Sequence, residues 1–195
     1  MTSLAPNSAP PSSSSSSGAA ASDASSLFFG KFEIPASHIF YTSPSKLSSA
    51  LVNLKPIVPG HVLVIPTRAG AVRMKDLSPE EYSDLWSTVR VVQSLVEAHH
   101  SCEASNVAAQ DGRPAGQSVP HVHVHILPRK VGDFEVSDEV YEILDQWGPW
   151  RNPEGVKEAR KKEKSEGGGM VVDDSKRRDR TAGEMAEEAT LYRKP

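Results

Sequence analysis

The chain of 195 residues contains a single cysteine, Cys102. One cysteine forms no internal disulfide and supplies no Cys-x-x-Cys half-site, which excludes a disulfide scaffold and a zinc cage built from cysteines. Long apolar runs are also missing. The most apolar stretch, residues 57–65, is interrupted by Pro59, Gly60 and His61 and is far shorter than the roughly 20 residues that span a bilayer. We therefore expect no membrane association and a cytoplasmic location, with the nucleus as a second one.

The first 26 residues have little charge and few large apolar side chains. Eleven of them are Ser and three are Pro, and Asp23 is the only charged side chain among them. Such a segment cannot bury enough apolar surface to offset the entropy lost on ordering it. We predict that residues 1–26 form a disordered Ser/Pro/Ala-rich head. Because the first basic residue is Lys31, a secretory or transit peptide is not expected.

Residues 151–180 are rich in charge of both signs, with 10 basic and 7 acidic side chains. This composition is typical of a solvated, flexible insertion. Basic clusters at 160–162 and 176–178 are interleaved with acidic residues, so we expect no specific nucleic-acid binding. The globular domain is then predicted at 27–150, and a C-terminal helix or tail at 181–195.

Alternating and β-branched runs predict five strands, at residues 38–42, 49–53, 61–66, 106–110 and 121–127. Short, turn-rich connections favour antiparallel pairing. One long helix is expected to begin after Ser78, with Pro79 in its first turn and Glu81 completing a capping box. Its predicted buried face holds Tyr82, Leu85, Trp86, Val89, Val92, Leu95, Val96 and His99. Together these elements predict an α+β domain, an antiparallel sheet of about five strands with one long helix on its face.

Two shorter helices are also predicted. One begins at Ser137 and carries apolar residues at 140, 143, 144 and 147. The other begins at Thr181, where Glu184 makes a second capping box.

The chemistry is concentrated in residues 110–129, QDGRPAGQSVPHVHVHILPR. His121, His123 and His125 alternate with aliphatic residues, so in a strand all three imidazoles emerge on one face. One interpretation is a metal site, because His-x-His on a strand can present two zinc ligands. His121 and His125 would lie roughly 13 Å apart on a straight strand, too far to reach one ion, and a third ligand would have to be His61 or a distant carboxylate.

The other interpretation makes one imidazole a nucleophile. A neutral histidine can attack phosphorus and form a phosphoramidate, which splits one difficult displacement into two easier ones. Such a residue needs its second ring nitrogen held by an acceptor, and donors for the phosphate oxygens. The preceding loop supplies donors, because Gly112 and Gly116 allow close backbone approach and Gln117 and Ser118 lead into the strand.

These residues carry a family resemblance. The run HVHVHIL resembles the histidine triad motif of the HIT superfamily, and ALVNLKPIVPGHVLVIPTR at residues 50–68 is similar to its fragile histidine triad branch. The likeness covers about residues 28–141. It implies a HIT-like fold for the 27–150 domain, and a homodimer in which two sheets join.

The resemblance also implies roles for individual residues. His123 is expected to be the nucleophile that becomes adenylylated, His125 to contact the phosphate and bridging oxygen, His121 to orient the strand, and His61 to support them. Substrate contacts are implied for Asn53, Gln110, Gly116, Gln117, Ser118, Val119 and His125. An adenine slot is implied for Phe29, Ile34, Leu51 and Leu63, which could equally be ordinary core residues.

The activity implied is hydrolysis of dinucleoside polyphosphates, with diadenosine triphosphate cleaved to AMP and ADP through a covalent AMP-histidine intermediate. A divalent cation, Mg²⁺ or Mn²⁺, is expected to arrive with the substrate, and no zinc caged by the protein is expected. The alternative is a nucleotide-binding signalling or sensor protein of the same fold, in which the substrate complex is the active species.

Overall fold

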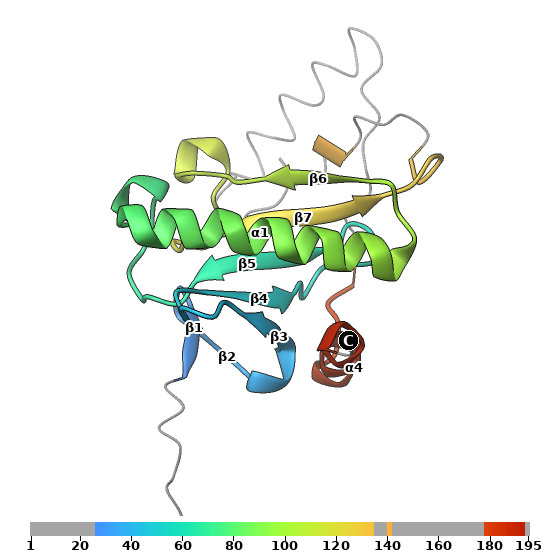
Figure 1. Cartoon of the computed structure of the whole chain (residues 1–195), viewed down its shortest axis with the longest axis horizontal. Helices are drawn as coiled ribbons and strands as arrows, with labels where there is room; N and C mark the ends of the chain where they lie inside the picture. The colour runs from blue at the N-terminus through green and yellow to red at the C-terminus, as the bar shows by residue number, and fades with distance from the viewer. Residues whose placement is uncertain (1–25, 135–139, 142–177, 194–195) are drawn as a thin grey trace, which may run out of the picture.

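The computed structural model describes residues 26–134, 140–141 and 178–193. Five strands form one antiparallel sheet in the order β3-β4-β5-β7-β6, and a long helix, α1, crosses one face of it (Figure 1). A two-stranded hairpin, β1-β2, and a C-terminal helix, α4, complete the domain. The bounds are β1 Leu27–Phe29, β2 Phe32–Ile34, β3 Ile39–Thr42, β4 Ser48–Val52, β5 Val62–Pro66, α1 Pro79–His100, β6 Ala104–Ala108, β7 Val124–Arg129 and α4 Ala182–Arg193, with 3-10 turns at Ala36–His38, Met74–Asp76 and Arg113–Ala115.

The predicted α+β architecture and all five sheet strands are present, but the histidine strand begins later than expected. β7 starts at Val124 rather than at residue 121. The backbone before it is held by loops instead of a neighbouring strand, because Val122 N–H donates to Ala71 O at 2.7 Å and His121 N–H donates to Val119 O at 2.8 Å. The β1-β2 hairpin was not predicted, because its strands have only three residues each.

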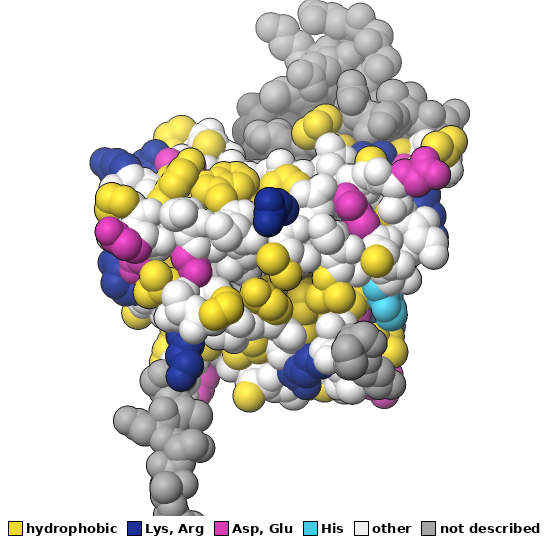
Figure 2. Space-filling model, viewed as in Figure 1, with side chains coloured by type: hydrophobic (Ala, Val, Ile, Leu, Met, Phe, Trp, Pro, Cys, Tyr) yellow, Lys and Arg dark blue, Asp and Glu magenta, His cyan; other side chains and the backbone are white. Residues whose placement is uncertain are grey.

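Helix α1 begins as its capping box predicts. Ser78 Oγ accepts the Glu81 N–H, and the Glu81 carboxylate accepts the Ser78 N–H. The side chains buried against the sheet include Leu85, Val89, Val92 and Val96. Tyr82, Trp86 and His99, which we predicted on this face, are exposed, and the rings of Tyr82 and Trp86 pack edge to face on each other. The buried stripe is therefore narrower than the predicted one. Figure 2 shows hydrophobic side chains scattered among polar ones on the surface that carries α1.

Strand alternation sorts the core into two layers. Ala50 and Val52 of β4 pack in the cluster beneath α1, whereas Leu51 between them packs in a second cluster. The same parity holds in β7, where Val124 and Ile126 join the α1 cluster. Because successive side chains in a strand point to opposite faces, His125 lies on the face of the sheet opposite α1.

The ends of the chain are described in part. The predicted C-terminal helix is present, and Thr181 and Glu184 form its capping box. Arg178 to Arg180, which we assigned to the charged insertion, are described residues. Arg180 lies against the loop after β4, where its N–H donates to Leu54 O at 2.9 Å. The rest of the predicted insertion, the predicted head except Ser26, and most of the helix predicted from Ser137 lie outside the described residues.

Within residues 26–134, 140–141 and 178–193, no helix combines the length and apolar character needed to cross a membrane.

Candidate active site

The three histidines are buried, and hydrogen bonds to backbone carbonyls fix two of their rings. His121 Nε2 lies 2.9 Å from Pro66 O, and His123 Nδ1 lies 2.8 Å from His121 O. A carbonyl oxygen only accepts, so each of these nitrogens carries the hydrogen. In neutral His123 the lone pair is then on Nε2. That atom is buried and has no hydrogen-bond partner in the part of the chain that the structure describes.

Burial controls the charge of this ring. Loss of solvation lowers the pKa of His123 to about 4 and outweighs the rise caused by the hydrogen bond to His121 O, while the charge of the neighbouring His121 adds a smaller lowering. Burial also lowers the pKa of His121. His123 is therefore an uncharged imidazole at neutral pH, with an available lone pair at Nε2, which is the form that a nucleophile requires.

His61 and His125 form a relay that begins at a backbone amide. Ile57 N–H donates to His61 Nδ1 at 3.1 Å, and His61 Nε2 lies 2.9 Å from His125 Nδ1. Because Nδ1 of His61 accepts, the neutral ring carries its hydrogen on Nε2 and donates it to His125. His125 Nδ1 then accepts, so the hydrogen of its own ring is on Nε2. The relay makes His125 Nε2 a hydrogen-bond donor, whereas His123 Nε2 carries a lone pair and can only accept.

Asn53, predicted to contact the substrate, is buried beside His61. Its amide nitrogen lies 3.2 Å from His61 Nδ1 and 3.0 Å from His61 Nε2. Since Nε2 donates to His125, we assign the Asn53 hydrogen bond to Nδ1, where the Asn53 amide shares the single lone pair with the Ile57 N–H. The Asn53 side chain thus supports the relay.

The glycine-rich loop before the triad is tightly packed. Gly112 has φ +100° and Gly116 has φ +90°. A Cβ on Gly116 would lie 2.6 Å from Gln110 Nε2, and one on Gly112 would lie 2.7 Å from Arg73 Cζ. Both positions therefore require glycine. The structure brings Gln110 and Gly116 together, and their predicted contact with substrate stays a prediction.

The side chain of Gln117, which we predicted to contact the substrate, is hydrogen-bonded within the protein. It is buried, donates to Val72 O at 2.7 Å and to His121 O at 3.1 Å, and accepts Gly112 N–H at 3.1 Å. These bonds occupy the amide within the protein. Gln117 therefore holds the loop against the start of the histidine segment, and its backbone N–H also donates within the loop, to Gly112 O at 3.1 Å. Its predicted contact with substrate stays a prediction.

An Arg73–Asp111 pair anchors the same loop, and the sequence did not point to it. The Asp111 carboxylate accepts Arg73 Nε at 3.0 Å and Nη2 at 3.1 Å, and also accepts Met74 N–H at 2.9 Å. The guanidinium hydrogen bond is the main cause that lowers the pKa of Asp111. The two residues are 38 positions apart, and no local pattern links them.

The four residues predicted to line the adenine slot lie together. Phe29, Leu51 and Leu63 belong to one buried cluster with Ile65, and Ile34, Leu27 and Val119 pack against it. The Phe29 ring meets His121 and His123 edge on, with centroids 5.7 and 5.1 Å apart. The apolar cluster thus borders the triad, and Val119 and half-buried Ser118 connect it to the glycine-rich loop.

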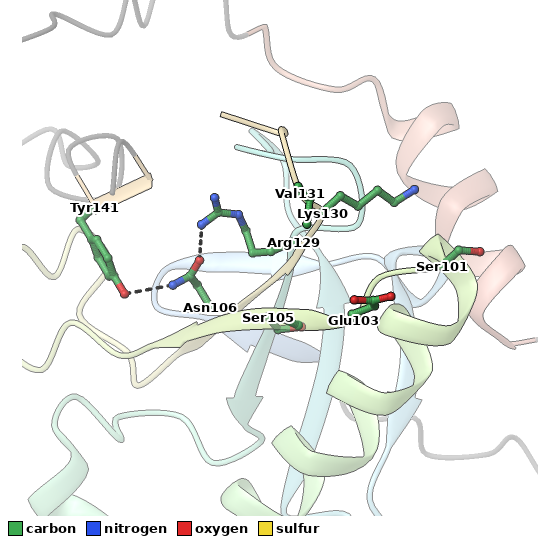
Figure 3. Close-up of a pocket in the computed structure, with 9 residues that line it drawn as sticks. Ser101, Glu103, Ser105, Asn106, Arg129, Lys130, Val131 and Tyr141 are labelled. Atoms are coloured by element: carbon green, nitrogen blue, oxygen red, sulfur yellow. Dashed lines mark hydrogen bonds between the residues drawn. The ribbon is translucent and has the colours of Figure 1, made fainter. Parts of the chain in front are cut away.

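A separate pocket of about 600 Å³ lies at the other end of β6 and β7 (Figure 3). Arg129 there is paired with Asp133 through both carboxylate oxygens and donates to Asn106, which donates to Tyr141 Oη at 3.0 Å. The pocket lies at the C-terminal end of β7, whereas the histidines lie at its N-terminal end. Its arginine is already neutralised, and we assign it no chemistry.

Comparison with known proteins gives one family. The HIT domain model matches residues 31–132. A relative from Arabidopsis thaliana, bifunctional bis(5'-adenosyl)-triphosphatase/adenylylsulfatase FHIT, is 46% identical over 87% of this chain and 83% of its own. A bis(5'-nucleosyl)-tetraphosphatase [asymmetrical] from Schizosaccharomyces pombe is 56% identical over 62% of this chain and 64% of its own. The crystal structure of the C. elegans NitFhit protein matches with a TM-score of 0.61 and 36% identity, over 92% of this chain and 31% of that one.

Proposed function

The chain belongs to the HIT domain family, and on this basis we propose that it hydrolyses dinucleoside triphosphates, cleaving diadenosine triphosphate to AMP and ADP. The relative from Arabidopsis thaliana carries this activity in its name. Within the structure, the observation that supports it best is the pair of opposed tautomers. His123 offers a lone pair and His125 a hydrogen on two rings whose centroids are 5.0 Å apart.

The first step follows from that pair. His123 Nε2 attacks the α-phosphorus, the N–P bond forms, and the bond from phosphorus to the bridging oxygen breaks. ADP leaves with the electron pair of that bond, while His125 Nε2–H donates a hydrogen bond to the departing oxygen. The His123 Nδ1–H bond to His121 O stabilises the positive charge that the ring gains when it is phosphorylated.

The second step restores the enzyme. Water attacks the phosphorus of the AMP-His123 adduct and gives up one proton to solvent, the N–P bond breaks with its electron pair returning to Nε2, and AMP is released. The ring regains its lone pair at Nε2, because Nδ1 keeps its hydrogen throughout. The low pKa of His123, about 4, favours its return to the neutral form at neutral pH.

Replacing the nucleophile tests this mechanism. His123→Asn is expected to lower turnover by about 10⁴- to 10⁶-fold, the usual effect of removing a covalent nucleophile. Brief incubation of the wild type with labelled diadenosine triphosphate and acid-free quenching is expected to trap an AMP adduct on His123. Substantial activity in the variant, together with no trapped adduct, would refute the covalent route.

The preferred substrate is tested by direct comparison. The names of the relatives include a triphosphatase with adenylylsulfatase activity and a tetraphosphatase. We therefore compare kcat/KM for diadenosine triphosphate, diadenosine tetraphosphate and adenylyl sulfate. We expect the triphosphate to give the highest value, and AMP and ADP as the only nucleotide products. A higher value for either of the others would reassign the substrate.

We also propose that Mg²⁺ or Mn²⁺ enters with the polyphosphate and is not caged by the protein. Asp111, the only carboxylate of the glycine-rich loop, is committed to Arg73 and Met74 N–H. EDTA is expected to suppress turnover and added Mg²⁺ to restore it. Stoichiometric zinc in protein purified without added metal would contradict this proposal.

A homodimer joined through the β6 edge is proposed as the assembled form. Helix α4 flanks the opposite edge strand, where Arg193 donates to Ile39 O of β3. The outer edge of β6 pairs with no strand among the described residues and exposes Val107, and such edges pair with another chain. Light scattering is expected to give a dimer for the wild type and a monomer for Val107→Glu. A wild type that stays monomeric at micromolar concentration would contradict it.

A further inference from the structure

The C-terminal segment, residues 178–193, is attached to the loop that carries Asn53 and His61. This loop, residues 53–61, joins β4 to β5. Arg180 N–H donates to Leu54 O at 2.9 Å, and Arg180 Nη1 donates to Asn53 O at 3.3 Å. Lys55 lies 3.7 Å from Asp179. The segment thus meets the loop at three consecutive residues.

Arg180 is held rigidly enough to act as an anchor. Its side chain is 15% exposed and forms an ion pair with Glu188, which lies in the second turn of α4 and is 14% exposed. Met185, Ala189 and Tyr192 of α4 are buried in the cluster beneath α1. Figure 1 shows α4, in red, beside β3 and β4. The position of Arg180 is therefore set by the main core.

The same helix supports the other end of the loop. Tyr192 Oη lies 2.7 Å from His100 Nε2 and donates to Glu188 at 2.8 Å. The His100 ring in turn lies so close to Gly60 that a Cβ there would meet it at 2.5 Å. Gly60 directly precedes His61, so both ends of the loop rest on contacts that lead back to α4.

We propose that the C-terminal segment is a positioning element of the active site, which fixes the loop from Asn53 to His61 and through it the hydrogen that His125 offers to the leaving oxygen. This inference rests on the proposed hydrolase function. The path is short, because Arg180 holds the Asn53 carbonyl, the Asn53 amide donates to His61, and His61 donates to His125. The segment lies outside residues 31–132, which the HIT domain model matches.

Two arginines of the segment provide a matched pair of variants. Arg180→Ala removes the bond to Asn53 O and the pair with Glu188. Arg193→Ala is the control, because Arg193 also donates to backbone carbonyls, but to those of Ala36, Ser37 and Ile39, none of which belongs to the loop. Arg180→Gln is a milder variant that keeps a donor and serves if the alanine variant does not fold.

Two substrates with different leaving groups distinguish a positioning role of Arg180 from a general loss of folded protein. For diadenosine triphosphate we expect Arg180→Ala to lower kcat/KM about tenfold, the effect of losing one hydrogen bond to a charged group. For the p-nitrophenyl ester of AMP, whose leaving group needs no donor, we expect less than about a threefold loss. Arg193→Ala is expected to lower the melting temperature and leave the ratio of the two substrates unchanged. An unchanged ratio in folded Arg180→Ala or Arg180→Gln, or the same change in Arg193→Ala, would overturn the proposal.

A measurement that does not depend on catalysis tests this inference separately from the proposed function. The ¹⁵N chemical shifts of the His61 ring report which nitrogen carries hydrogen. We expect a single tautomer with hydrogen on Nε2 in the wild type, and a mixture in Arg180→Ala. If the wild type hydrolyses neither substrate, the proposed function fails, while the ring shifts still decide the positioning role. Identical His61 shifts in the two proteins would refute it.

Discussion

Replacing His123 by glutamine gives a stability test of the buried neutral imidazole. Burial lowers the pKa of His123 in the folded protein to about 4, from an ordinary value of 6.5. The unfolded chain therefore takes up a proton as the pH falls through 6.5, while the folded protein does so only near 4. The stability that the protein gains by keeping His123 neutral is therefore fully present above pH 6.5 and is lost as the pH falls from 6.5 to 4. At about 1.36 kcal/mol per pH unit, the loss over this interval is about 3 kcal/mol.

Urea denaturation of wild type and His123→Gln at pH steps from 7.5 to 4 measures this loss. Titrating groups that do not interact with His123 contribute equally to both proteins, so the difference between their free energies of unfolding reports His123 together with its coupling to His121. We expect the wild type to lose about 3 kcal/mol more than the variant over the range. His99→Gln, at an exposed histidine, controls for removal of an imidazole. A wild-type-minus-variant difference that stays constant from pH 7.5 to 4 would show that His123 is solvated, and would remove the basis for its assignment as a neutral nucleophile.

Three further substitutions test the surroundings of His123. Gly116→Ala is expected to lower kcat/KM at least tenfold, because its Cβ would lie 2.6 Å from Gln110 Nε2 and its φ is +90°; wild-type kinetics would contradict the tight loop. Asp111→Asn is expected to raise KM about three- to tenfold by loosening the loop from Arg73, and an unchanged KM would mean that the pair has no influence on binding. His61→Phe is expected to lower kcat for diadenosine triphosphate at least tenfold, whereas His61→Gln, which keeps a donor, retains more activity; equal losses would disprove the relay.

The sequence predicted those parts of the fold that short-range patterns determine. Ser78, Pro79 and Glu81 fix the start of α1 within one turn, and Thr181 with Glu184 does the same for α4. These caps work because the partners are three residues apart, so the pattern is visible in the sequence. Alternation likewise located the sheet strands to within a few residues.

Contacts between distant residues were not predictable in this way. The strand pattern extends to His121, but β7 begins at Val124 because Ala71 O and the Gln117 amide occupy the preceding backbone. Arg180 is charged and lies at the end of the predicted insertion, yet its backbone N–H donates to Leu54 O. In each case the partner lies in another part of the chain, where neither periodicity nor composition indicates it.

Burial keeps His123 uncharged, and backbone groups fix which ring nitrogens of His61 and His123 carry hydrogen. The chain carries a net charge of -3, so overall charge does not attract a polyphosphate. The relay to His125 starts at the Ile57 N–H, which can only donate, and His123 is fixed by the His121 carbonyl, which can only accept. Backbone groups do not titrate near neutral pH, so these two tautomers persist as long as both rings stay neutral. A lone pair on His123 and a hydrogen-bond donor on His125 are therefore set side by side in the folded protein, on rings whose centroids are 5.0 Å apart.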